Sequence, residues 1–342
     1  MKDFFIDWHM ELVSPDRLPT IIMAWLLVTI VGAVTGPIHG NANPFLWLLY
    51  DKTLGAMAAR LDKKERKVRD LMFRGLIMMI LSVVVAYTFG KWAAAVAYVY
   101  DFKGFTQIVF LALAMTGGSV WFALLRLFFA MRQKKVSKGA YYNIAQSSRR
   151  NLSASDDFTI TRTAMGFAAK SFDKGLVGPA FWYFLVGLPG AFMYAILATF
   201  VWRFGKEGFT KGFGKVALAV ESLLGFVPHI LAGVLVALAG LFTPTSGMTR
   251  AYVGLLNPEK RSKYEEGGLP LTAMAYALDV NLGGPGTDLD GSAVKPRWTG
   301  PEKATAQLEA GHLKRAMYLM LIAHLLFIAS IIGMMFWSGM LF

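Results

Sequence analysis

The chain has 342 residues, 55% of them hydrophobic, and a mean hydropathy of +0.47. One soluble core cannot bury that much apolar surface, so the composition excludes an ordinary soluble domain and predicts that lipid covers part of the protein. The 35 lysines and arginines, against 22 acidic residues, do not indicate nucleic-acid binding, because they lie in loops between apolar runs, as the positive-inside rule expects. The lack of cysteine excludes disulfides, thiolate metal sites and a cysteine nucleophile.

Six apolar stretches approach or exceed the roughly 20 residues that a helix needs to cross a bilayer. They lie at 20–36, 75–99, 105–128, 176–203, 216–242 and 316–341. The first is expected to be a retained anchor rather than a cleaved signal. The fourth carries Gly178-Pro179 and a Gly-Leu-Pro-Gly run from Gly187, which predict a kink or a re-entrant turn. The sequence therefore predicts an all-α polytopic membrane helical bundle of about six spans, within one integral membrane domain over 1–342.

Loop charge sets the expected orientation in the membrane. The segments rich in lysine and arginine are 37–74, 129–175 and 243–315, and these are the predicted cytoplasmic loops of a protein in a bacterial inner membrane. The turn around Lys103 and the acidic N-terminal leader are expected to face outward. A loop with Lys206, Lys211 and Lys215 does not fit this alternation.

Two loop segments have helical patterns of their own. Apolar residues recur near helical spacing among basic ones over 54–71, which is typical of an amphipathic helix at the surface of anionic lipid; a solvated charged linker is the alternative. The proline- and glycine-rich loop 243–315 contains a short helical pattern at 269–280. Loops this long are usually functional or disordered.

Glu221 is the only carboxylate well inside a predicted span, and Pro228 and His229 follow it in the same apolar run. A buried ionisable group in a membrane is costly, so one interpretation gives Glu221 a functional role. The other is a structural acid that pairs with a neighbouring helix. Both remain open at this point.

The other polar motifs give weaker evidence for a functional site. The run Leu282-Gly283-Gly284-Pro285-Gly286 could let backbone amides approach a phosphate, but no Gly-Lys-Ser/Thr completes a P-loop. Asp288-Leu289-Asp290-Gly291 lacks the remaining ligands of a calcium loop and is better interpreted as a turn. The histidines show no metal-ligand spacing, and no serine lies in a nucleophile-elbow pattern. Arg149 and Arg150, ahead of Arg162, could bind a phosphorylated ligand or simply follow the positive-inside rule.

Two regions carry a family resemblance. From Arg150 to Pro228 and from Gly268 to Gly300, the chain resembles the CobD/CbiB family of cobalamin biosynthesis, the adenosylcobinamide-phosphate synthases, with the AmpE-type proteins as relatives. The family's arginines, its acidic helical segment and its Gly-x-Pro-x-x-x-x-Tyr span are matched in order at Arg150, Arg162, Ala169, Gly175, Pro179, Gly187, Pro189 and Tyr194. Its later Leu-Gly-Gly-Pro and Lys-Pro-x-x-Gly regions resemble Leu282 to Pro285 and Lys295 to Gly300.

The chain departs from the family mainly at acidic positions. The motif's two glutamates, its asparagine and its aspartate correspond here to Gly166, Lys170, Ser171 and Lys174. Asp173 is displaced by one position from the motif aspartate. Of a later Asp-Asp pair, only Glu221 keeps a carboxylate.

The resemblance implies an ATP-dependent ligase that joins aminopropanol or its phosphate to a propionate of a corrinoid substrate, with Mg²⁺ held by carboxylates. It makes Glu221 and Asp173 the catalytic candidates. The substrate-binding candidates are Arg150, Arg162, Gly283, Gly284 and Lys295. No metal ligands are assigned, since the motif carboxylates are replaced.

The missing carboxylates favour a second hypothesis, a catalytically inactive relative that serves as a membrane sensor or as an accessory subunit of a membrane complex. The expected partners are therefore the lipid bilayer, a corrinoid, a phosphorylated small molecule and, under the second hypothesis, a membrane protein. Nucleic acid is not among them. A transporter ranks last, because the chain shows no repeated halves.

Overall fold

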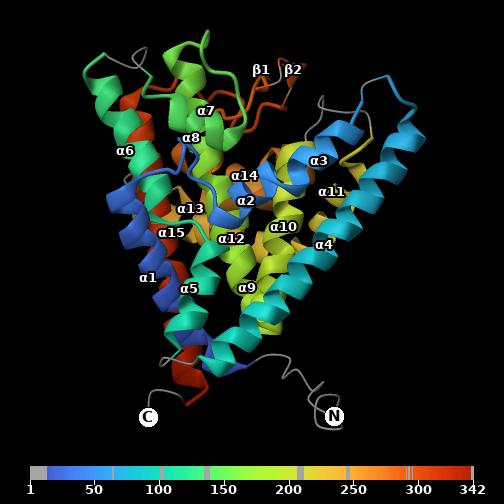
Figure 1. Ribbon diagram of the computed structural model, residues 1–342. Helices are drawn as coiled ribbons and strands as arrows, with labels where there is room; N and C mark the ends of the chain where they lie inside the picture. The colour runs from blue at the N-terminus through green and yellow to red at the C-terminus, as the bar shows by residue number, and fades with distance from the viewer. Residues whose placement is uncertain are drawn as a thin grey trace.

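A computed structural model describes residues 14–63, 65–100, 104–134, 139–205, 212–243, 247–289, 291, 293–294 and 296–339. The described chain is a bundle of helices (Figure 1). Their bounds are α1 Leu18–Thr35, α2 Phe45–Lys52, α3 Leu54–Leu61, α4 Val68–Val99, α5 Phe105–Leu113, α6 Gly118–Arg132, α7 Tyr142–Ser148, α8 Asp157–Phe172, α9 Gly178–Val186, α10 Leu188–Phe204, α11 Lys215–Leu224, α12 Phe226–Ala239, α13 Met248–Leu256, α14 Gly268–Leu278 and α15 Ala310–Trp337. Two short antiparallel strands, β1 Gly286–Thr287 and β2 Ala293–Val294, complete the fold.

The prediction of an all-α membrane bundle is confirmed. Within the described residues, α1 with its leading 3-10 turn, α4 and α15 are each long and apolar enough to cross a membrane. The pairs α5–α6 and α11–α12 are bent by 47° and 66°, and counting each pair as one span raises the total to five. All six predicted apolar stretches are helical, but they are not six single spans.

The fourth predicted stretch is a helical hairpin. Gly187 ends α9 with a φ of 74°, a left-handed conformation that glycine adopts without strain. The chain then reverses, so that a Cβ at Gly190 would meet the Trp182 carbonyl oxygen at 2.6 Å, and Gly178 lies against the ring of Tyr194. The expected turn is therefore present, and it makes two antiparallel helices out of one apolar stretch.

The close approach of Gly178 to Tyr194 gives a stability prediction. Gly178→Ala places a methyl group on the Tyr194 ring, and we expect this overpacking to cost about 1 to 3 kcal/mol. Gly311→Ala is the matched control, because Gly311 lies near the start of α15 with open space around its Cβ position. Thermal unfolding of the detergent-purified variants measures both. Equal melting temperatures would contradict the hairpin packing.

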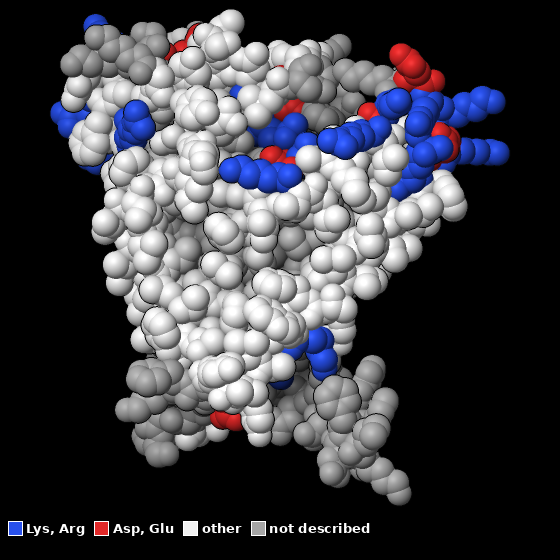
Figure 2. Space-filling model, in the orientation of Figure 1, with Lys and Arg blue, Asp and Glu red and all other residues white. Residues whose placement is uncertain are grey.

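The hairpin also bears on the loop between α10 and α11, whose lysines do not fit the alternation of loop charge expected from the sequence. Its residues 206–211 lie outside the described part of the chain, but a Cβ at Gly212 would meet the carbonyl oxygen of Val68, where α4 begins, at 2.8 Å. Gly212, the first described residue after these, therefore lies beside the start of α4. Figure 2 shows lysines and arginines gathered at this end of the molecule, above a belt with almost no charge on the face shown.

Three predicted loop features differ in detail. The amphipathic pattern over 54–71 is interrupted, because α3 ends at Leu61 and α4 begins at Val68; its contact with lipid stays a prediction. The predicted loop 129–175 contains α7 and all of α8, and α8 continues through a π-helical turn, Asp173–Val177, into α9. The helical pattern at 269–280 is α14, whose residues are buried apart from Leu269, because its small and apolar side chains pack against α12 and α8.

Candidate functional site

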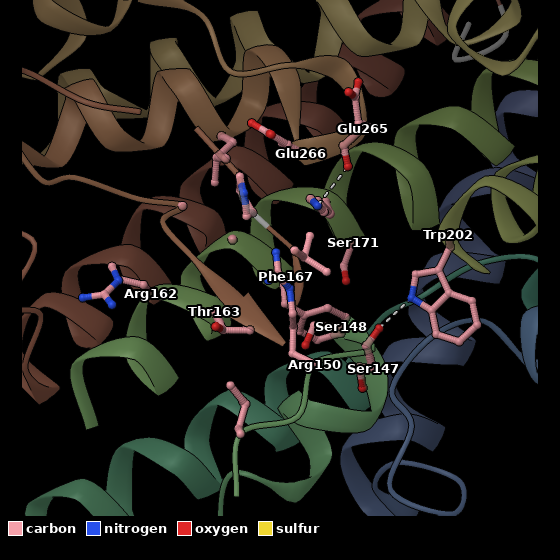
Figure 3. A pocket seen from close by; sticks show the side chains of 18 of the residues that line it. Ser147, Ser148, Arg150, Arg162, Thr163, Phe167, Ser171, Trp202, Glu265 and Glu266 are labelled. Atoms are coloured by element: carbon pink, nitrogen blue, oxygen red, sulfur yellow. Dashed lines mark hydrogen bonds between the residues drawn. The ribbon is translucent and has the colours of Figure 1, made fainter. Parts of the chain in front are cut away.

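One cavity dominates the basic end of the described structure. It holds about 1390 Å³ of empty space, including its open mouth. Its walls come from the α7–α8 connection, α8, the π-helical turn, α10, the 3-10 turn Tyr264–Glu266 and the glycine-rich loop before β1. Figure 3 shows side chains from these distant segments, among them Arg150, Phe167, Trp202 and Glu266, arranged around this space.

The positions of α8 and of the π-helical turn that the resemblance assigns to the family motif form one wall of this cavity. Gly166, Lys170, Ser171 and Lys174 all line it. Their spacing of four, five and eight residues puts them on one face of a helix. These four positions, at which the chain departs from the motif, therefore face the cavity, and two of them are lysines.

The described charges on the cavity wall are mostly positive. The cations are Arg150, Arg162, Lys170, Lys174 and Arg297, and the carboxylates are those of Glu265 and Glu266. Such a cation set favours carboxylate or phosphate ligands, because charge-assisted hydrogen bonds are about twice as strong as neutral ones.

The two predicted arginines have different surroundings. Burial lowers the pKa of Arg150, and the charges of Asp288 and Glu266 partly oppose that effect. Its guanidinium lies 2.6 Å from the place where Gly286 would carry a Cβ. Arg162 donates to the Ala306 carbonyl oxygen and to the Thr159 hydroxyl, both at 2.6 Å, and lies over the ring of Trp298. Arg162 therefore stabilises the cavity wall through these contacts, and Arg150 is the better placed of the two to bind a ligand.

The predicted glycines also line the cavity. Gly283 and Gly284 have φ values of 87° and 84°, and a side chain on them would collide with the Arg297 carbonyl group and the Trp298 ring, respectively. Leu282 exchanges backbone hydrogen bonds with Thr299 at 2.8 and 3.0 Å, which holds the loop against the following segment. The fifth substrate-binding candidate, Lys295, lies outside the described residues.

Lys170 points into the cavity from α8. Its Nζ donates to the backbone carbonyl oxygen of Glu265 at 3.1 Å. Burial lowers the pKa of Lys170 to about 7, and the nearby charge of Arg150 contributes in the same direction. Burial therefore moves proton exchange by this amine toward neutral pH.

Glu221 lies behind the cavity wall rather than on it. Its carboxylate is 0% exposed and accepts hydrogen bonds from Lys174 Nζ at 2.6 and 2.8 Å. The hydroxyls of Tyr194 and Tyr264 donate to the same carboxylate at 3.2 and 2.9 Å. Burial and the charge of Glu221 raise the pKa of the Tyr264 phenol well above its usual range, so this phenol stays a donor. These contacts match the second interpretation of Glu221, that of a structural acid that pairs with a neighbouring helix.

Asp173 is the other predicted catalytic residue, and it is also buried. Its Oδ2 lies 2.6 Å from His229 Nδ1. The Leu269 amide donates to His229 Nε2 at 2.9 Å, so Nε2 carries no proton and Nδ1–H donates to Asp173. Asp173 Oδ1 has no hydrogen-bond partner among the described residues. Neither Asp173 nor Glu221 belongs to the described cavity lining, but Lys174, which pairs with Glu221, does.

The described carboxylates do not supply the set that the resemblance implies for Mg²⁺. Glu266 accepts from the Arg297 amide at 3.2 Å, and Glu265 is its only carboxylate neighbour in the described lining. No group of three or more acidic, histidine or cysteine side chains that could hold a metal occurs in the described residues. The described residues therefore do not fit the Mg²⁺ that the resemblance implies.

The comparisons with known proteins agree with one another. A family model described as CobD/Cbib protein matches residues 22–320. The cobalamin biosynthesis protein CobD of a Sinorhizobium species is 25% identical over 300 residues, which cover 85% of this chain and 91% of the relative. The protein of the same name from Klebsiella pneumoniae is 23% identical over 329 residues, covering 92% and 98%. The one from Brucella suis is 30% identical over 138 residues, covering 40% and 42%. No solved structure matches.

Proposed function

This chain belongs to the CobD/CbiB protein family, and from that premise we propose that it is a membrane ligase of cobalamin biosynthesis that joins an amino alcohol phosphate to a corrinoid propionate. One observation carries the proposal: the residues of α8 and the π-helical turn that the resemblance assigns to the motif line a single cavity whose described charges are mostly positive. Both proposed substrates carry an anionic group at neutral pH, a propionate or a phosphate, and such a wall favours these groups.

The other cavity residues suit such substrates. Arg150 and Lys174 offer cationic donors to a propionate or a phosphate, while Trp47, Phe167 and Trp202 supply apolar surface for the body of a large ligand. In the proposal a nucleoside triphosphate activates the propionate by phosphoryl transfer, and the amine then displaces the phosphate. In the proposal the basic end, seen in Figure 2, faces the cytoplasm, as the positive-inside rule expects, and the nucleotide is available there.

A second candidate function is a catalytically inactive relative that binds the corrinoid as a sensor or accessory subunit. The observation that favours it is the position of Glu221 and Asp173. Both are buried, where Glu221 pairs with Lys174 and Asp173 with His229, and both lie outside the described cavity lining. Under this alternative the cavity keeps its ligand but lacks a catalytic acid pair.

Binding and product formation by the detergent-purified protein separate the two functions. The corrinoid acid is followed by its visible absorbance, with and without Mg-ATP, and products are analysed by mass after aminopropanol phosphate is added. Saturable binding with an amide product supports the ligase. Saturable binding without product supports the sensor or accessory subunit, and a folded protein that binds no corrinoid overturns both.

A further inference from the structure

We propose that Lys170 is the general base of this cavity, the group that takes a proton from the attacking amine. The inference rests on the proposed ligase function and goes beyond it by assigning a catalytic residue. In the step, the ammonium group of the amino alcohol phosphate gives a proton to Lys170 Nζ. The free amine attacks the acyl phosphate carbon, a C–N bond forms, the acyl C–O bond breaks, and the second proton leaves with the phosphate.

The two lysines on this wall differ in their partners. Lys174 donates to both oxygens of the buried Glu221 carboxylate, so its ammonium group is engaged in a charge-assisted pair. The one hydrogen bond found for Lys170 Nζ in the described structure goes to a backbone carbonyl oxygen, that of Glu265. A neutral amine can still donate one N–H to that oxygen while its lone pair is free for a substrate proton. Lys174 is thus suited to hold charge and Lys170 to exchange a proton.

The charges around Lys170 come from three elements. Arg150, after α7, and Lys174, on the π-helical turn, disfavour its protonated form, while Glu265 and Glu266, on the 3-10 turn, favour it. Burial has the largest effect, and the resulting pKa of about 7 is suited to a base that works near neutral pH. Because the pKa is lowered, the base is inactive well below pH 7 and fully available above it.

The side chain is also held in position. It rises from the last turn of α8, and a Cβ at Gly267 would meet its Cε at 3.2 Å, so the stem packs against the chain just before α14. Glu266 is the competing base on the described wall, but its carboxylate already accepts from the Arg297 amide.

Rates of amide formation across pH test the assignment. Lys170→Arg keeps a cation but cannot give up its proton at these pH values, and we expect a rate loss of at least 100-fold with corrinoid binding within a few-fold of wild type. Lys303→Gln, at an exposed position outside the described lining, is the matched control and should keep the wild-type rate and its rise through pH 7. A Lys170→Arg enzyme with the wild-type rate and pH profile would overturn the inference. If only a Glu266→Gln enzyme lost the rise in rate through pH 7, Glu266 would be the base instead.

A measurement that needs no activity separates this inference from the proposed function. Brief acetylation of the folded protein at pH 6 to 10, read by peptide mass analysis, reports the free-amine fraction of each lysine. Lys170 should reach half of its maximal reactivity near pH 7, well below the value of about 10.4 for a lysine in a model peptide. An ordinary titration of Lys170 in wild-type protein overturns the base assignment even if amide is formed. If no amide is formed, the ligase function fails, and with it the catalytic role, whatever the labelling shows.

Discussion

Glu221→Ala should strongly destabilise the protein, because it leaves the Lys174 ammonium buried without its carboxylate. Removing one partner of a buried ion pair costs about 3 to 5 kcal/mol, and here Glu221 is 0% exposed and also accepts from two tyrosine hydroxyls. The melting temperature of the detergent-purified variant, followed by tryptophan fluorescence, measures the effect. The exposed Glu302→Ala is the control and should melt like wild type.

A paired replacement separates the buried charge from the missing side chain. Lys174→Met with Glu221→Leu removes both charges and keeps similar volumes, so it should recover most of the stability that Glu221→Ala loses. Glu221→Gln keeps the shape and the tyrosine contacts, and its effect on amide formation shows whether the carboxylate also takes part in the reaction. If the Glu221→Ala protein had the same melting temperature as the Glu302→Ala control, the structural role of the pair would be disproved.

Arg150→Glu should weaken binding of the corrinoid acid by at least 100-fold. Loss of a hydrogen bond to a charged group alone corresponds to about 1.5 to 3 kcal/mol, or roughly 10- to 150-fold, and this substitution adds a repelling carboxylate on the same wall as Glu266. Arg150→Gln should therefore show the smaller of the two effects. Titration of the visible absorbance of the corrinoid measures both.

The control for Arg150 is Arg60→Glu, which makes the same charge change at an exposed position on α3. Its affinity should equal that of wild type. Because Arg150 is largely buried, its contribution should also persist at high salt, where exposed charges are screened. Equal losses in the two variants would mean that only the overall basic charge attracts the ligand, and that Arg150 makes no contact with it.

Part of the site could be predicted from local sequence. Gly283 and Gly284 form a cavity-lining turn because only glycine tolerates their left-handed backbone beside Arg297 and Trp298. Arg150 and Arg162 were found through the family pattern, and both line the cavity. Lys170 and Lys174 were noted only as departures from that pattern. Their spacing on one helix face was the signal that could have joined them to the site.

The sequence by itself determined the class of this protein. Apolar length specifies α1, α4 and α15, since a bilayer requires long uninterrupted helices. It could not determine the direction of the chain after Gly187 or the burial of α14, because hydrophobic patterns do not encode which helices meet. Only the tertiary structure decided that Glu221 pairs with Lys174, 47 residues away, and that Asp173 bonds to His229, 56 residues away. Such pairings depend on how helices pack, and so does the position of a cationic cavity in front of them.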